Sequence, residues 1–276
     1  MQVCSTKAEF RGFLDNVRAL GRTVGLVPTM GALHDGHLSL LRAATAECDV
    51  VALTIFVNPL QFAAGEDLSA YPRPLERDLE LAEAAGTDVV FTPNNAEMYP
   101  VPVVTTVHVD GLTAPMEGAA RPTHFDGVTT VVAKLFNIAG TCRAYFGEKD
   151  FQQLAVIRRL VRDLDVPVKI ISCPTVREAD GLAMSSRNAR LSPAQRADAP
   201  RIRRALAAAS KLRSPEQVLA SARADIEASP LARIDYLALV DAETLQAAGT
   251  LDHPTILATA VFYGEVRLID HVRVEG

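Results

Sequence analysis

The feature that most constrains the fold is an alternation of short β-branched runs with longer helical patterns over the first 175 residues. The strand-like runs lie at residues 23–27, 49–57, 88–91, 144–146 and 168–172, and the helical patterns lie at 37–47, 74–85, 126–138 and 150–163. This alternation is typical of a parallel sheet with crossover helices. We therefore predict an α/β protein in which residues 1–175 form a Rossmann-like parallel-sheet domain.

The pattern changes in the last hundred residues. A helical stretch rich in Ala and Arg comes first, and strand-like runs follow at 233–240, 255–262 and 266–269. This order predicts a smaller α+β C-terminal lid domain at residues 176–276, with the boundary near 174–191.

Composition narrows the function classes. With 28 basic and 33 acidic residues, the net charge is −5, which argues against a nucleic-acid binder that neutralises phosphates. No apolar run approaches the roughly 20 residues of a membrane helix, and the charged N-terminal stretch does not resemble a secretory signal. The four cysteines follow no metal or disulfide spacing. We therefore expect a cytoplasmic protein with reduced thiols and no membrane or nucleic-acid partner.

A glycine-containing turn joins the first predicted strand to the helix that follows. Open α/β sheets bind ligands beyond the carboxyl ends of their strands, and this turn, residues 28–37 (PTMGALHDGH), lies at such an end. Gly31 and Gly36 permit close backbone approach, and the unpaired N–H groups of a helix start attract phosphate. The two commoner nucleotide signatures are absent, because there is no Gly-x-Gly-x-x-Gly and His37-Leu38 replaces the Lys-Ser/Thr pair of a P-loop.

Two histidines in this turn, His34 and His37, are the candidate catalytic groups. Zinc binding is a minority interpretation, since no third ligand is evident and the spacing differs from that of His-Glu-x-x-His. Either histidine alone would more often cap the helix or fill the core. Two imidazoles beside a glycine turn favour donation of hydrogen bonds to phosphate oxygens as charge builds during displacement at phosphorus.

Three further motifs follow predicted strands or the domain boundary. The amides of Asn58 and Gln61 suit a hydroxylated substrate, although an ordinary turn is equally plausible. Lys149 is a mobile charge suited to phosphate, with a surface lysine as the structural alternative, and Asp150 is well placed as an N-cap. The string 184–187 (MSSR) offers two hydroxyls and a guanidinium for phosphates, unless it is a plain Ser-rich loop.

The motifs together carry a family resemblance. Residues 29–37 resemble the HIGH signature of the nucleotidyltransferase superfamily. With the strings at 56–62, 71–73, 146–154, 174–178 and 181–188, in that order, the chain resembles the pantoate-β-alanine ligase (pantothenate synthetase) family, and the string at 121–125 also matches it. The resemblance implies condensation of (R)-pantoate with β-alanine, through a pantoyl adenylate, to give pantothenate, AMP and pyrophosphate.

The resemblance also implies site residues. His37 would be the principal catalytic donor, assisted by His34 and Lys149. Gln61 would bind pantoate and β-alanine and Gln153 would bind pantoate, with Asn58 in the same substrate site. The implied ATP-binding residues are Met30, Gly31, Ala32, Leu33, His34, Asp35, Gly36, His37, Gly147, Glu148, Lys149, Asp150, Val176, Met184, Ser185, Ser186 and Arg187.

The resemblance further implies ATP as a substrate, Mg²⁺ as a cofactor and a homodimer, and Asp78 is a candidate magnesium contact. Thr123, Arg190 and His271 depart from the family pattern, which usually has glycine, tyrosine and asparagine at these places. Two alternatives stay open. One is a related nucleotidyltransferase that passes AMP or CMP to a phosphate, and the other is a nucleotide-sensing module without turnover.

Overall fold

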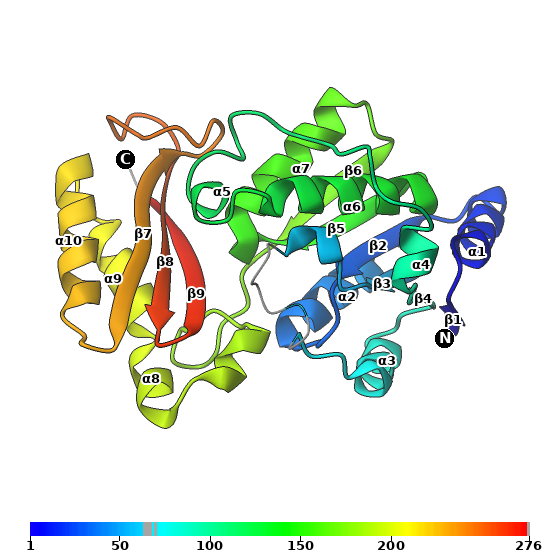
Figure 1. The fold of residues 1–276 in the computed structure, drawn as a ribbon, viewed down its shortest axis with the longest axis horizontal. Helices are drawn as coiled ribbons and strands as arrows, with labels where there is room; N and C mark the ends of the chain where they lie inside the picture. Colours follow the sequence, from blue (N-terminus) through cyan, green and yellow to red (C-terminus); the bar gives the residue numbers. More distant parts are fainter. Residues whose placement is uncertain (63–67, 69–70, 275–276) are drawn as a thin grey trace. The chain divides into compact units, whose positions relative to one another are not determined.

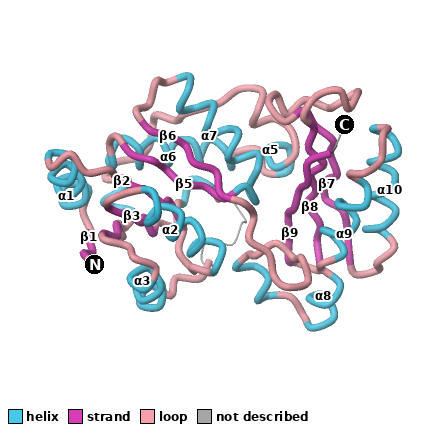
Figure 2. Tube along the Cα trace, turned by 180° about the vertical axis from the view of Figure 1, so that it is seen from behind, coloured by secondary structure: helices cyan, strands magenta, loops and turns pink. Residues whose placement is uncertain are grey.

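The computed structural model describes residues 1–62, 68 and 71–274. Within these residues the chain forms one six-stranded parallel sheet and one three-stranded antiparallel sheet (Figures 1 and 2), which confirms the predicted α/β class with a smaller α+β part. Backbone contacts divide the chain into two compact units. The N-terminal unit comprises Met1–Val109, Arg121–Glu148 and Gln153–Pro174, and the C-terminal unit comprises Asp110–Ala120, Lys149–Gln152 and Thr175–Gly276. A division into domains 1–175 and 176–276 stays a prediction.

The parallel sheet lies in the N-terminal unit. Its strands are β1 (Gln2–Cys4), β2 (Val24–Thr29), β3 (Val50–Ile55), β4 (Val89–Phe91), β5 (Cys142–Gly147) and β6 (Val168–Cys173). Their spatial order is β1-β4-β3-β2-β5-β6. The chain runs outward from β2 to β3 and β4, then returns to β5 on the other side of β2, so the connections change direction between β2 and β5. Ligands of open α/β sheets bind at such a switch point.

Helices cover this sheet. They are α1 (Lys7–Ala19), α2 (Asp35–Glu47), α3 (Leu75–Ala84), the short α4 (Asn95–Met98), α6 (His124–Ala139) and α7 (Phe151–Asp163). In both views α2 and α6 lie on opposite sides of the strands (Figures 1 and 2). Leu38, Leu41 and Ala44 of α2 pack on Val27 and Leu53 of the sheet. The core thus holds the start of α2 beside the end of β2. Among the described residues, no helix is both long and apolar enough to cross a lipid bilayer.

Two N-terminal elements were not predicted. β1 has three residues and pairs only with β4, so it is too short to produce an alternating pattern. α1 begins at a capping box in which the Thr6 side chain accepts from the Glu9 N–H and the Glu9 carboxylate accepts from the Thr6 N–H. That Thr-x-x-Glu pattern is a helix-start signal readable from sequence.

The antiparallel sheet belongs to the C-terminal unit. Its strands are β7 (Ala232–Asp241), β8 (Thr255–Tyr263) and β9 (Val266–Val274), and α5 (Glu117–Ala120), α8 (Pro193–Asp198), α9 (Arg201–Ala209) and α10 (Pro215–Glu227) belong to the same unit. Ile202, Leu206 and Ile226 form its core with buried residues of β8 and β9. β9 continues past the predicted end at residue 269, because Asp270 is buried in a bidentate ion pair with Arg177 (2.7 and 2.9 Å).

Candidate functional site

The loop between β2 and α2 has a constrained backbone. Gly31 and Ala32 have positive φ angles of +81° and +52°. A Cβ on Gly31 would lie 2.9 Å from Asp78 Oδ2 and 3.0 Å from Ile55 Cγ2, so this position requires glycine. Asp78, from α3, is buried, and its two oxygens accept the N–H groups of Ala32 and Leu33, both at 2.8 Å. The N–H groups of Ala32 and Leu33 are therefore occupied. The expectation of unpaired N–H groups at the helix start is wrong at Gly36, whose N–H donates to His34 Nδ1.

His34 and His37 cap the start of α2. His34 Nδ1 accepts the Gly36 N–H at 3.1 Å, and His37 Nδ1 accepts the His34 N–H at 3.4 Å. The two ring centroids are 4.1 Å apart. A nitrogen that accepts a hydrogen bond carries no proton, so each neutral ring holds its proton on Nε2. The structural explanation of capping is thus confirmed, and the same bonds make Nε2–H the donor of each ring.

A second cluster follows β3, where Pro59–Gln61 forms the short 3₁₀ helix η1. Asn58 is buried, and its Nδ2 donates to Gln61 Oε1 and to the Gly127 carbonyl, both at 3.0 Å. Asn58 Oδ1 accepts from the Tyr99 hydroxyl at 2.8 Å and from the Leu60 N–H at 3.4 Å. Both ends of the Asn58 amide are thus engaged within the protein, and its visible role is to orient Gln61.

Arg121 and His124, to which the sequence analysis gave no role, also contact Gln61. Its carbonyl accepts from Arg121 Nη2 at 3.3 Å and lies 3.1 Å from His124 Nδ1. A Cβ on Gly127 would lie 2.1 Å from the Leu60 carbonyl, so α6 approaches η1 too closely for any other residue. The family string at 121–125 is the only sequence signal for these contacts.

β5 is the strand that pairs with β2 on the side opposite β3. β5 ends at Gly147, where an added Cβ would meet nothing within 4 Å, so protein packing does not require a glycine there. Glu148 begins the 3₁₀ helix η2 (Glu148–Asp150). Gln153, predicted to bind pantoate, is half-buried in the first turn of α7. Met30 precedes the left-handed turn, and Asp35 is the first residue of α2.

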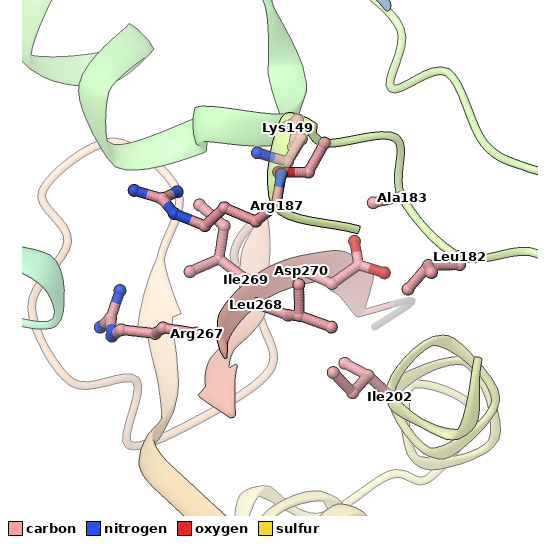
Figure 3. Close-up of a pocket in the computed structure, with 10 residues that line it drawn as sticks. Lys149, Leu182, Ala183, Arg187, Ile202, Arg267, Leu268, Ile269 and Asp270 are labelled. Carbon is pink, nitrogen blue, oxygen red and sulfur yellow. The ribbon is translucent and has the colours of Figure 1, made fainter. Parts of the chain in front are cut away.

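The C-terminal unit has a pocket that brings together three predicted ATP-binding residues, Lys149, Ser185 and Arg187 (Figure 3). Figure 3 shows the charged ends of Lys149 and Arg187 on the side of the pocket away from Leu182 and Ile202. The Asp270 carboxylate also lines the pocket and lies beside Leu182 in Figure 3, so the cationic side of the pocket is the one at Lys149 and Arg187.

Not every charged residue of this pocket is available to a ligand. Arg267 donates to Glu117 Oε2 at 2.7 Å and to Asp235 Oδ2 at 2.9 Å. Burial disfavours the Arg267 cation, but these carboxylates outweigh it and raise the pKa of Arg267. Arg187 is exposed and makes no ion pair with another described residue. Lys149 Nζ lies 3.7 Å from Asp150 Oδ1. Among the cations that line this pocket, Arg267 is thus held by two carboxylates, whereas Lys149 and Arg187 are not.

The other predicted residues of this unit lie in the segment leading to the pocket. The Met184 N–H donates to the Val176 carbonyl at 3.0 Å. Ser185 caps the 3₁₀ helix η3 (Ser186–Arg190), and its Oγ accepts the Arg187 N–H at 3.2 Å. These bonds give the segment a defined backbone, and its choice between phosphate binding and a plain Ser-rich loop stays a prediction.

The three departures from the family pattern lie before α6, at the end of η3 and on β9. Thr123 is the N-cap of α6 and makes no side-chain capping bond, and Arg190 is the exposed last residue of η3. His271 lies on β9 with its ring centroid 5.2 Å from that of Phe151.

No group of three His, Cys, Asp or Glu side chains among residues 1–62, 68 and 71–274 is arranged to hold a metal ion. Asp78 does not fit such a role, because it is buried and its oxygens face the backbone N–H groups of Ala32 and Leu33. A Mg²⁺ ion that enters with a nucleotide relies mainly on phosphate oxygens and water, which these residues permit.

Comparison with known proteins gives consistent matches over the whole chain. Residues 2–273 match the family model described as Pantoate-beta-alanine ligase. The chain is 52% identical over 280 residues to the pantothenate synthetase of Moorella thermoacetica, covering 100% of this chain and 99% of that protein. The pantothenate synthetase of Geobacter sulfurreducens is 49% identical over 276 residues, covering 98% of each.

Solved structures agree. The crystal structure of pantothenate synthetase from Thermus thermophilus matches with a TM-score of 0.95 and 48% identity, covering 100% of both chains. That of pantoate-beta-alanine ligase from Francisella tularensis, complexed with beta-gamma ATP and beta-alanine, matches with a TM-score of 0.84 and 33% identity, covering 100% of this chain and 98% of the other.

Proposed function

The chain belongs to the pantoate-β-alanine ligase family, and on this premise we propose that it condenses (R)-pantoate with β-alanine, using ATP, to give pantothenate, AMP and pyrophosphate. The main observation behind the proposal is the family match over residues 2–273, which includes all the motifs named above. The homologue complexed with a form of ATP and with β-alanine supports the choice of substrates.

The reaction has two displacements. A pantoate carboxylate oxygen attacks the α-phosphorus of ATP; the bond from that phosphorus to the bridging oxygen breaks, and pyrophosphate leaves with the electron pair. The β-alanine amine then attacks the carbonyl carbon of the pantoyl adenylate. The C–N bond forms, the bond from the carbonyl carbon to the phosphate oxygen breaks, AMP leaves with that electron pair, and the nitrogen loses one proton to water. Positioning and charge stabilisation supply most of the acceleration in such chemistry.

His37, assisted by His34, donates Nε2–H to the phosphate oxygens of ATP as charge moves toward pyrophosphate. This assignment is supported by the Nδ1 bonds, which hold both rings in the tautomer that donates from Nε2. Residues 30–37 bind ATP at the switch point of the sheet, where the imidazoles of His34 and His37 are the donors to phosphate.

Lys149 is the third catalytic residue, and its ammonium group neutralises charge on the reacting phosphates. Its place in the pocket with Ser185 and Arg187 supports this role. The remaining ATP-binding residues of this proposal are Gly147, Glu148, Asp150, Val176, Met184 and Ser186.

Gln61 binds pantoate, and Gln153 completes the substrate site. Because Asn58 occupies Gln61 Oε1, the Nε2 group of Gln61 is the end that binds the substrate. An amide donor of this kind suits the hydroxyl and carboxylate oxygens of pantoate and the carboxylate of β-alanine. Asn58 serves this site by holding Gln61.

When bound with ATP, Mg²⁺ would reduce repulsion between the phosphates and the attacking carboxylate. The protein works as a homodimer in the cytoplasm. Its free cysteines, Cys4, Cys48, Cys142 and Cys173, support a reducing compartment.

The test is to incubate the purified protein with ATP, Mg²⁺, pantoate and β-alanine and to measure pantothenate, AMP and pyrophosphate. Equal amounts of pantothenate and AMP are expected, with pyrophosphate release that requires pantoate. Nucleotide transfer to a phosphate acceptor without pantoate would favour a related nucleotidyltransferase. Nucleotide binding without any product would favour a sensing module.

A further inference from the structure

Asp78 holds an unusual position for an acidic residue. Its side chain is buried, with 1% exposure, and it makes no ion pair with another described residue. Its partners are instead the backbone N–H groups of Ala32 and Leu33, one on each oxygen at 2.8 Å. Hydrogen bonds to an ionised acceptor are stronger than neutral ones, and the first turn of α3 further stabilises the negative charge.

These contacts conflict with a magnesium ligand. Mg²⁺ demands near-ideal octahedral geometry and retains several waters. Asp78 is 1% exposed and each of its oxygens already accepts an N–H group, so its surroundings leave no room for an ion that retains several waters.

We propose that Asp78 is a positioning residue, which holds the loop between β2 and α2 in its left-handed turn and thereby orients His34 and His37. Gly31 and Ala32 both have positive φ, a conformation that Ala32 adopts only when its surroundings demand it. Asp78 meets that demand, since it binds the N–H groups on either side of the Ala32 α-carbon and lies against the α-carbon of Gly31.

The histidines depend on this turn through the chain. Leu33 is followed directly by His34, whose Nδ1 caps α2 at the Gly36 N–H, and the His34 N–H in turn donates to His37 Nδ1. If Leu33 rotated, the His34 N–H would leave His37. Release of the Asp78 bonds would therefore disorder both imidazoles without removing either.

The first experiment compares Asp78→Asn with Glu76→Gln, which alters an exposed carboxylate in the same turn of α3. Asparagine can accept only one of the two N–H groups and presents its own donor to the other. In ligand-free protein, we expect amide hydrogen exchange at Ala32 and Leu33, followed by NMR, to accelerate at least 10-fold in Asp78→Asn and to stay unchanged in Glu76→Gln. Unchanged exchange in Asp78→Asn overturns the proposal.

The second readout separates positioning from metal binding, and it alone rests on the proposed ligase function. In Asp78→Asn, kcat should fall at least 10-fold, while the Mg²⁺ concentration for half-maximal rate stays within twofold of wild type. A rise of 10-fold or more in that concentration, with kcat recovered at saturating Mg²⁺, identifies a metal ligand and overturns the proposal.

A third measurement needs no variant and decides the matter if Asp78→Asn does not fold. Wild-type protein is titrated with Mg²⁺ without nucleotide while exchange at Ala32 and Leu33 is followed. Unchanged exchange is expected, whereas acceleration means that the ion takes the Asp78 oxygens and overturns the proposal. If wild type makes no pantothenate, the proposed function fails, but both exchange results still test the role of Asp78.

Discussion

Asn58 Nδ2 donates to Gln61 Oε1 at 3.0 Å, so one buried amide fixes the direction of the other. The Tyr99 hydroxyl completes the arrangement, because it donates to Asn58 Oδ1 at 2.8 Å. Burial raises the pKa of Tyr99 to about 12, which keeps this donor protonated over the working range of pH. The three residues form a relay that ends at the Nε2 group proposed to bind pantoate.

Tyr99→Phe tests this relay. Loss of one buried hydrogen bond has a net effect of about 1 kcal/mol, so we expect KM for pantoate to rise roughly fivefold with KM for ATP unchanged. Steady-state kinetics of pantothenate formation measure both. Tyr263→Phe is the matched control, since it removes a tyrosine hydrogen bond to Asp198 at 3.0 Å and should alter neither KM. Equal shifts in the two KM values of Tyr99→Phe would count against the relay.

His37→Ala should lower kcat by roughly 10²–10³-fold, the usual effect of removing one preorganised donor to a developing charge. Pyrophosphate release in the presence of pantoate measures the first step, and circular dichroism checks the fold. His253→Ala, at an exposed position, should leave the rate unchanged. An unaltered rate of pyrophosphate release in His37→Ala would show that the donor is misassigned.

Substitution by alanine should affect stability at one glycine and ATP affinity at another. Gly31→Ala forces a Cβ to within 2.9 Å of Asp78 Oδ2 at a φ of +81°, and it should cost about 1–3 kcal/mol of stability. Gly147→Ala meets no protein atom within 4 Å, so stability should change by less than about 0.5 kcal/mol. ATP affinity of Gly147→Ala should nevertheless fall, because the open space beside β5 is the proposed place of the nucleotide. Denaturant unfolding and calorimetric titration with ATP measure the two effects, and undiminished ATP affinity would move the nucleotide elsewhere.

The buried ion pair of Asp270 with Arg177 should be essential to the C-terminal unit. Asp270→Ala leaves a partly buried guanidinium without its carboxylate, and we expect a loss of about 3–5 kcal/mol in the free energy of unfolding. Glu227→Gln breaks the exposed pair with Arg223 and should cost about 0.5 kcal/mol or less. Urea unfolding compares them, and similar losses would contradict the assignment.

Thiol reactivity should differ between Cys142 and Cys48. Burial raises the pKa of Cys142 to about 12, so at pH 8 its thiol stays protonated and lacks the reactive thiolate form. Cys48 is only partly buried. Brief alkylation of native protein at pH 8 should label Cys48 well before Cys142, as read by peptide mass spectrometry. Labelling of Cys142 should rise only as the pH approaches 12 or the protein unfolds, and faster labelling of Cys142 at pH 8 would contradict its burial.

Much of the N-terminal unit was predictable because its signals are local. Strand-like runs at 23–27 and 168–172 and the helical pattern at 37–47 each correspond to one observed element, since periodicity reports which face of a segment is buried. The HIGH-type turn was likewise readable, because its glycines and histidines lie within ten residues of one another. These local signals also sufficed to predict a site at the carboxyl end of β2.

The amino-acid sequence by itself therefore determined the α/β class, the family and the residues of the principal motifs. Only the tertiary structure decided the contacts that give those residues their roles: Asp78 accepts the N–H groups of Ala32 and Leu33, and Asn58 holds Gln61. Likewise, β9 continues through the acidic residue Asp270, because Arg177, distant in the sequence, neutralises its charge. The reason is physical, since the roles of a buried polar group depend on partners dozens of residues away, which packing brings within hydrogen-bonding distance and which local periodicity does not encode.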